Sequence, residues 1–300
     1  IDVHKNQAEV KREEALDTDK PHGVKVELEI EARYQKGKQG VDEYLRQTSI
    51  TNPHLQLIYV NPDNEKIVFK RASNILPKEP KAIKPHPHGT EMGVLIRMLK
   101  GSKTKNLQSF LTTEFCRIGS GTAKEIITKA LLNVNDKPQN LMHDQAEKLY
   151  KSMQEAKVIA PPTDCLSPIG ENDFLKSVQT EIKAEFYTSI TRSPTVYRGY
   201  PFQIDCALAY GGELNPEESI KVMRFANRVP LLYQHSACAV TEAIKETNWR
   251  AYGLQQSGGN LPAGPVVLAV HIASVWVPFT SEAKEAIAHY PEIIKVIKLA

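Results

Sequence analysis

Lys284 is the residue whose type and position first raise a chemical question. It lies in the stretch VPFTSEAKEAI, residues 277–287, where an apolar strand runs into the expected start of a helix near Ser281. The amino end of a helix holds phosphate groups well but is an unfavourable place for a lysine. Lys284 is therefore either a solvated cation, offset by Glu282 and Glu285, or a cation aimed at a phosphate. The spacing alone does not decide between these readings.

A second group of basic side chains surrounds a stretch with helical periodicity. Glycine-containing turns precede helix starts there, and the free N–H groups of a helix start bind phosphate. The basic residues could hold a DNA backbone without reading its sequence. They could equally form the solvated surface of a small helical domain. The residues are Lys100, Lys103, Lys105, Arg117, Lys124 and Lys129.

Two further motifs favour structural roles. KPHPHG places His86 and His88 at a spacing that zinc could use, but no cysteine or carboxylate at standard spacing completes a site. We expect a rigid linker with locally hydrogen-bonded imidazoles, and no metal. LQQSGGNLPAG, residues 254–264, is not a P-loop and does not stand between a strand and a helix, so it is predicted to be a flexible surface turn.

The composition is that of an ordinary globular protein. The 300 residues are 41% hydrophobic and 24% charged, enough for two domains or three small ones. A net charge of +3 is too near balance to identify a nucleic-acid binder by itself. The four cysteines have no metal-type or redox-type spacing, which is typical of a reducing compartment.

The sequence contains no apolar run long enough for a membrane span and no signal peptide. We therefore expect a cytoplasmic protein with no membrane partner. The chain begins at Ile1 with a polar stretch and stops inside an apparent helix. We interpret it as an excised piece of a longer protein.

Periodicity predicts three groups of elements separated by irregular, proline-rich linkers near residues 76–89 and 159–170. The first group is a half-buried strand over 23–34, a helix over 39–50 and a hairpin over 55–72. The second group is helical from residue 90 to about residue 150. The third group has strands over 177–191, 202–212, 219–233 and 265–279, a helix over 236–249 and a last helix from about Ser281. This order predicts an α+β fold with one β–α–β crossover.

The assembled motifs resemble one family over essentially all 300 residues, the B subunit of archaeal DNA topoisomerase VI. The most specific motifs are RFANRVPLLYQ and the ending PFTSEAKEA. The others are KPHPHGTEMGVLIRML, FLTTEFCRIGSGTAKEI, PPTDCLSPIG, RSPTVYRGYPFQID and NWRAYGL.

The resemblance implies three domains. Residues 1–80 would be the C-terminal part of a GHKL ATPase α/β sandwich, and residues 86–165 a helix–two-turns–helix domain. Residues 172–300 would be the transducer, a second α/β sandwich. The asparagine helix, aspartate–glycine motif and glycine-rich lid that hold Mg-ATP in this family are not in this sequence. The chain alone is therefore expected neither to bind ATP tightly nor to hydrolyse it.

The resemblance also implies a function. In this family ATP binding dimerises two B subunits around a DNA duplex, and an A subunit cuts a second duplex, in an A2B2 heterotetramer that relaxes supercoils and is associated with the nucleoid. ATP and Mg²⁺ are the cofactors. Lys284 matches the transducer lysine that contacts the γ-phosphate, and Lys103, Lys105, Arg117 and Lys124 are weaker candidates for DNA binding. The alternative is a non-catalytic DNA-binding or scaffold protein that reuses these modules.

Overall fold

The computed structural model describes residues 10, 12–15, 17, 19, 21–34, 36, 37 and 39–300. The chain divides into two units, residues 1–34 and residues 35–300, which are described separately. The prediction of a half-buried strand over residues 23–34 is wrong for this structure. Residues 23–34 have no regular secondary structure, and Val24 is 93% exposed. A strand needs a neighbouring strand to pair its N–H and C=O groups, and the two sheets formed by the described residues include no strand from this segment.

The second unit begins with a helix and a hairpin, as predicted. Helix α1 (Val41–Thr51) is followed by β1 (Leu57–Val60) and β2 (Lys66–Phe69). The two strands are antiparallel, with Leu57 opposite Phe69. The connection is a tight turn in which Asn64 takes a left-handed conformation, which asparagine tolerates better than most residues.

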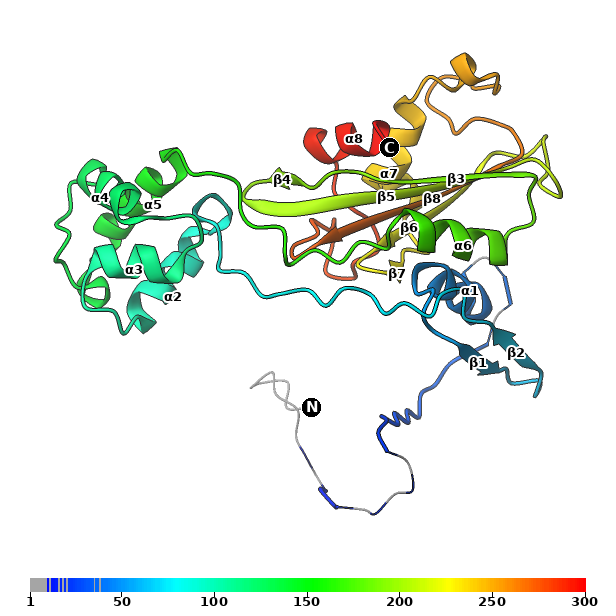
Figure 1. The fold of residues 1–300 in the computed structure, drawn as a ribbon, viewed down its shortest axis with the longest axis horizontal. Helices are drawn as coiled ribbons and strands as arrows, with labels where there is room; N and C mark the ends of the chain where they lie inside the picture. The colour runs from blue at the N-terminus through cyan, green and yellow to red at the C-terminus, as the bar shows by residue number, and fades with distance from the viewer. Residues whose placement is uncertain are drawn as a thin grey trace. The chain divides into compact units, whose positions relative to one another are not determined.

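The predicted helical stretch forms a small module with its own core (Figure 1). Its buried side chains come from every helix, among them Leu95, Phe110, Ile126 and Leu149. Asn106 caps α3 by accepting a hydrogen bond from the backbone N–H of Ser109 at 2.8 Å. The helices are α2 (Met92–Gly101), α3 (Leu107–Glu114), α4 (Ser120–Lys129) and α5 (His143–Glu155), and the short helix η1 (Pro87–Gly89) precedes them.

A mixed sheet organises the remainder of the chain, in the spatial order β3-β5-β8-β6-β7, with β4 paired to β5. Its central strand β8 is antiparallel to β5 and parallel to β6. The parallel pair is joined through helix α7, so the predicted β–α–β crossover is confirmed. The bounds are β3 (Phe186–Thr191), β4 (Thr195–Tyr197), β5 (Tyr200–Tyr210), β6 (Lys221–Ala226), β7 (Val229–Pro230), α7 (Ala239–Glu246) and β8 (Val266–Ser274).

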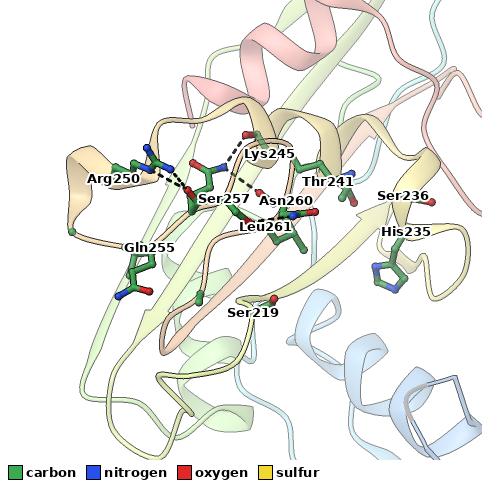
Figure 2. A pocket seen from close by; sticks show the side chains of 14 residues that line it. Ser219, His235, Ser236, Thr241, Lys245, Arg250, Gln255, Ser257, Asn260 and Leu261 are labelled. Carbon is green, nitrogen blue, oxygen red and sulfur yellow. Dashed lines mark hydrogen bonds between the residues drawn. The ribbon is translucent and has the colours of Figure 1, made fainter.

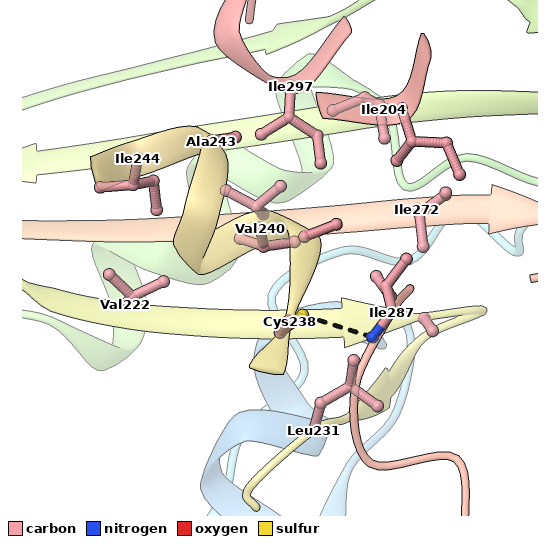
Figure 3. Packing of buried hydrophobic residues seen from close by; sticks show 14 of the residues in the cluster. Ile204, Val222, Leu231, Cys238, Val240, Ala243, Ile244, Ile272, Ile287 and Ile297 are labelled. Atoms are coloured by element: carbon pink, nitrogen blue, oxygen red, sulfur yellow. Dashed lines mark hydrogen bonds between the residues drawn. The ribbon is translucent and has the colours of Figure 1, made fainter. Parts of the chain in front are cut away.

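Helices cover both faces of this sheet (Figure 1). Helices α7 and α8 (Pro291–Lys298) pack on one face against Leu268, Val270 and Ile272 of β8, and Figure 3 shows part of this cluster. Helix α6 (Glu171–Glu181) and Ile50 of α1 pack on the other face. All residues of β8 are buried, as the continuous apolar run in the sequence predicted.

Two segments of the sheet region differ from the prediction. The predicted strand over residues 177–191 is a helix up to Glu181 and a strand only from Phe186. Phe174, Ser177 and Val178 face the core at helical spacing, and the neighbouring β-branched residues masked that period. The predicted strand over residues 219–233 is a hairpin, because Asn227 and Arg228 form a left-handed two-residue turn between β6 and β7.

No helix among the described residues is long and apolar enough to cross a membrane.

Candidate functional site

The stretch that carries Lys284 is a hairpin-shaped loop and not the start of a helix. The N–H of Ala288 donates to the carbonyl of Pro278 at 2.7 Å, and the N–H of Thr280 donates to the carbonyl of Ala286 at 2.9 Å. At the tip, the N–H of Lys284 donates to the carbonyl of Ser281 at 3.1 Å. The last helix begins only at Pro291, so the helix predicted from about Ser281 is wrong.

Burial of Ala286 and Ile287 explains why this loop replaces the helix. Both side chains are completely buried in the core between the sheet and α7. The carbonyl of Ile287 accepts the N–H of Ala239 at 2.8 Å, and the N–H of Ile287 lies 3.4 Å from the Cys238 sulfur (Figure 3). Extended backbone at residue 287 thus completes the first turn of α7, which a helix from Ser281 would leave unpaired.

Lys284 is displayed at the tip of this anchored loop. Its φ is 55°, a left-handed conformation that costs a residue with a Cβ roughly 1–2 kcal/mol. Its side chain is exposed, and within the described part of the chain it makes no hydrogen bond or ion pair. The neighbouring Glu285 forms no ion pair with it, and a Glu285 carboxylate oxygen instead accepts a 2.7 Å hydrogen bond from the amide of Gln234. Strained backbone that presents an unpaired cation is typical of a binding position.

A polar network built on two fully buried side chains crosses the opposite face of the same sheet. Asp205 on β5 and His271 on β8 are both completely buried, with 2.8 Å between a carboxylate oxygen and Nδ1. The N–H of Arg228 donates to His271 Nε2 at 3.0 Å, so Nδ1 carries the ring proton and the imidazole is neutral. The Arg228 guanidinium donates to the carbonyls of Thr51 and Pro168 at 2.8 and 2.9 Å. The network therefore ties α1 to the sheet that carries the Lys284 loop.

Burial and hydrogen bonding set the pKa values in this network. Burial lowers the pKa of His271, and this effect outweighs the neighbouring Asp205 carboxylate. Burial also raises the pKa of Asp205, but hydrogen bonds from His271, Thr191 and the Ile169 N–H outweigh it, so the pKa ends below its ordinary value. The sequence analysis missed this network. In the sequence, the network is marked by a single histidine and a single aspartate inside largely apolar strands.

The candidate DNA-binding residues lie on the surface of the helical module. Lys103 and Lys105 are exposed in the connection between α2 and α3, and Lys124 is exposed on α4. Arg117 is also exposed, but its Nε donates to the carbonyl of Ala160 at 3.0 Å, so part of its guanidinium holds the connector. Lys129 forms an ion pair with Glu155 at 2.6 Å.

His86 and His88 face backbone carbonyls and not a metal-ligand set. Their Nε2 atoms lie 3.1 Å from the carbonyl of Ile159 and 3.0 Å from that of Ala156. Desolvation by burial lowers the pKa of His86. No cluster of histidine, cysteine and carboxylate side chains in the described part of the chain could hold a metal ion.

The sheet with helices on both faces forms a layered α+β sandwich, and the loop after its central strand presents a cation. Residues 161–300 match the family model described as the transducer of the topoisomerase VI B subunit. This segment is therefore similar to that transducer family.

Known proteins extend the similarity to the whole chain. The chain is 48% identical over 301 aligned positions to the B subunit of type 2 DNA topoisomerase 6 from Methanococcoides burtonii, covering all of this chain and 48% of that protein. It is 44% identical to the corresponding subunit of Archaeoglobus fulgidus, of which it covers 50%. It is 34% identical to that of Thermococcus gammatolerans, of which it covers 61%. The chain thus spans about half the length of the first two relatives.

One solved structure, the B-subunit of DNA gyrase from Myxococcus xanthus, matches 41% of this chain and 34% of its own at 21% identity. The TM-score is 0.28, too low to equate the two folds.

Proposed function

We propose that this chain is the lever and DNA-adjacent portion of the B subunit of an ATP-dependent type IIB DNA topoisomerase. It would act with a DNA-cleaving A subunit in an A2B2 assembly that passes one duplex through another and relaxes supercoils. The similarity to topoisomerase 6 B subunits along the whole chain supports this proposal over a non-catalytic scaffold.

The observation that carries the proposal is the unpaired, exposed Lys284 on a loop anchored to the sheet. A cation fixed in this way can contact a phosphate without a large entropic cost, because the protein has already ordered its backbone. When bound, ATP with Mg²⁺ supplies a γ-phosphate that disappears on hydrolysis. Lys284 is the group that would sense this change in charge, and the sheet would pass it to the other domains.

The domain assignment is part of the same proposal. Residues 1–80 contribute the end of the ATPase domain, residues 86–165 the helix–two-turns–helix domain and residues 172–300 the transducer. The hydrogen bonds between Arg228 and Thr51, from the guanidinium to the Thr51 carbonyl and from the Thr51 hydroxyl to the Arg228 carbonyl, support a mechanical link between the first and third of these regions.

The test is to replace Lys284 in the complete protein assembled with its A subunit. Loss of one charged hydrogen bond of about 1.5–3 kcal/mol predicts that Lys284→Ala lowers ATP-dependent relaxation by roughly 10- to 100-fold. Lys284→Gly should lower it equally while leaving stability within about 1 kcal/mol, because relief of the left-handed strain offsets the added freedom of the unfolded chain.

The matched control is Lys295→Ala, which removes another exposed lysine from α8. It should relax DNA and turn over ATP like the unmodified protein. Unchanged relaxation and unchanged ATP turnover in Lys284→Ala would overturn the role assigned to Lys284.

A further inference from the structure

An open cavity of about 980 Å³ with several polar lining residues lies beside α7 (Figure 2), and Lys284 is not among its lining residues. One wall is α7 itself, where Thr241 and Lys245 lie one turn apart. The opposite wall is the loop of residues 253–263, which includes the SGG motif. His235 and Ser236, which directly precede α7, line one end.

The two charged side chains of the cavity lining, Lys245 and Arg250, are both positive, and no aspartate or glutamate lines it. His235 lines it too, but burial lowers the pKa of its imidazole, so it adds no charge near neutral pH. Of the carboxylates on α7, Glu246 is paired with Lys298 at 3.1 Å and, like Glu242, does not line the cavity. The side chain of Lys245 makes no hydrogen bond or ion pair with any residue that the structure describes. Such a lining favours an anionic occupant.

Thr241 provides an independent sign of a ligand. Its side chain is only 3% exposed and lines the cavity, and its Oγ1 has no hydrogen-bond partner among the described residues. A buried hydroxyl without a partner costs roughly 1–3 kcal/mol.

Hydrogen bonds hold the loop that forms the opposite wall. The Gln256 amide donates to the carbonyls of Lys245 and Asn260 at 2.9 and 3.2 Å. The Arg250 guanidinium donates to the carbonyl of Gln256 at 2.6 and 3.0 Å (Figure 2). The loop that we expected to be a flexible turn is therefore held to α7 by hydrogen bonds. These hydrogen bonds fix the shape of the cavity.

We propose that this cavity binds a phosphate group, held by the Lys245 ammonium and the Thr241 hydroxyl. Phosphate suits it better than a carboxylate, because phosphate oxygens can accept several hydrogen bonds at once and the lining offers hydroxyl and amide donors such as Ser236 and Asn260. The group could belong to a small phosphate compound or to a DNA backbone.

The test is calorimetric titration of inorganic pyrophosphate into the full chain and its variants. Lys245→Gln should weaken binding by about tenfold or more, the effect of losing a charge-assisted hydrogen bond. Thr241→Val should also weaken binding yet keep or raise the melting temperature, because it removes an unpaired hydroxyl at nearly constant shape. A purely structural threonine would not give this pair of effects. Lys176→Gln, at an exposed position on α6, should bind like the unmodified chain.

A short DNA duplex distinguishes the two sources of phosphate. If Lys245→Gln weakens pyrophosphate binding but not duplex binding, the natural ligand is a small phosphate compound. If it weakens both and pyrophosphate competes with the duplex, the site holds DNA backbone. The proposal is overturned if millimolar pyrophosphate does not bind, or if Lys245→Gln and Thr241→Val leave both affinities unchanged. Neither result depends on the outcome for Lys284.

Discussion

At the residue scale, His271 occupies an unusual position for a titratable group. It lies in the central strand with no exposed surface, and its Nε2 accepts the Arg228 N–H, which requires the neutral form, while its Nδ1–H donates to Asp205. A buried group that cannot accept a proton makes the folded state less tolerant of acid than the unfolded state. The network therefore gives folding a defined dependence on pH.

We expect the free energy of unfolding to fall as the pH drops below about 6.5, the ordinary pKa of histidine. Below that pH His271 binds a proton in the unfolded chain but not in the folded chain. For this one group, the slope of the free energy of unfolding against pH approaches about 1.4 kcal/mol per pH unit. The lowered pKa of Asp205 adds a loss in the same direction below its ordinary value of 3.8. Urea unfolding between about pH 5 and pH 8 measures the first effect.

His271→Gln is the matched variant, because its amide can donate to Asp205 and accept from Arg228 without titrating. Burial also lowers the pKa values of His54, His86 and His235, so the contribution of His271 is the difference between the two slopes. Equal slopes for the two proteins would contradict the prediction.

At the scale of elements, the β4–β5 hairpin joins the sheet to the helical module. Its turn residues Arg198 and Gly199 have positive φ, and Tyr200 beyond the turn donates its hydroxyl to the carbonyl of Gly89. Tyr200 also stacks on Trp276, with ring centroids 5.0 Å apart. The backbones of Gly89 and Gly199 approach so closely that neither position has room for a Cβ.

Gly199→Ala should therefore destabilise the chain by more than backbone strain alone. A Cβ at residue 199 would lie 2.6 Å from the Gly89 nitrogen and 2.8 Å from His86 Nδ1. The left-handed conformation adds roughly 1–2 kcal/mol. Gly253→Ala is the control, because Gly253 also has positive φ but no atom lies within 4 Å of the position that its new methyl group would occupy. In thermal unfolding, the melting temperature should fall further for Gly199→Ala than for Gly253→Ala. Equal decreases would argue against a close approach at η1.

At the scale of the whole molecule, the near-neutral net charge means that DNA binding must come from local patches. Lys103, Lys105 and Lys124 are exposed on the helical module and are the candidates for phosphate contacts. Lys129 and Arg117 already have protein partners, an ion pair and a carbonyl, respectively. The three lysines are therefore the more informative positions.

Replacing these three lysines together by glutamine should weaken duplex binding and reduce its salt dependence. The slope of log K against log salt should change by up to about 0.9 for each phosphate that is no longer neutralised. The control replaces exposed Lys137, Lys148 and Lys151 of the same module, which gives the same change in charge. If both triple variants bind duplex DNA alike over the salt series, the three lysines are only a solvated surface.

Much of the architecture could be predicted from residue order alone. Apolar periodicity located α1 to α5, α7 and the strands β1, β2, β5 and β8, because each is long or regular enough for its buried face to be read from residue spacing. The crossover followed from the order of elements, and the family from long, specific motifs. Lys284 was singled out from its place in the chain, and its role stays a prediction.

The conformation around Lys284 and the polar sites became clear only from the three-dimensional packing. Ala286 and Ile287 are buried against α7, and this long-range packing outweighs a local preference for helix. Likewise, Asp205 and His271 meet across neighbouring strands, and Lys245 and the SGG loop meet across a cavity, at separations in sequence that no periodicity encodes. Local propensity is a property of adjacent residues, whereas these sites are made by register and packing between distant ones.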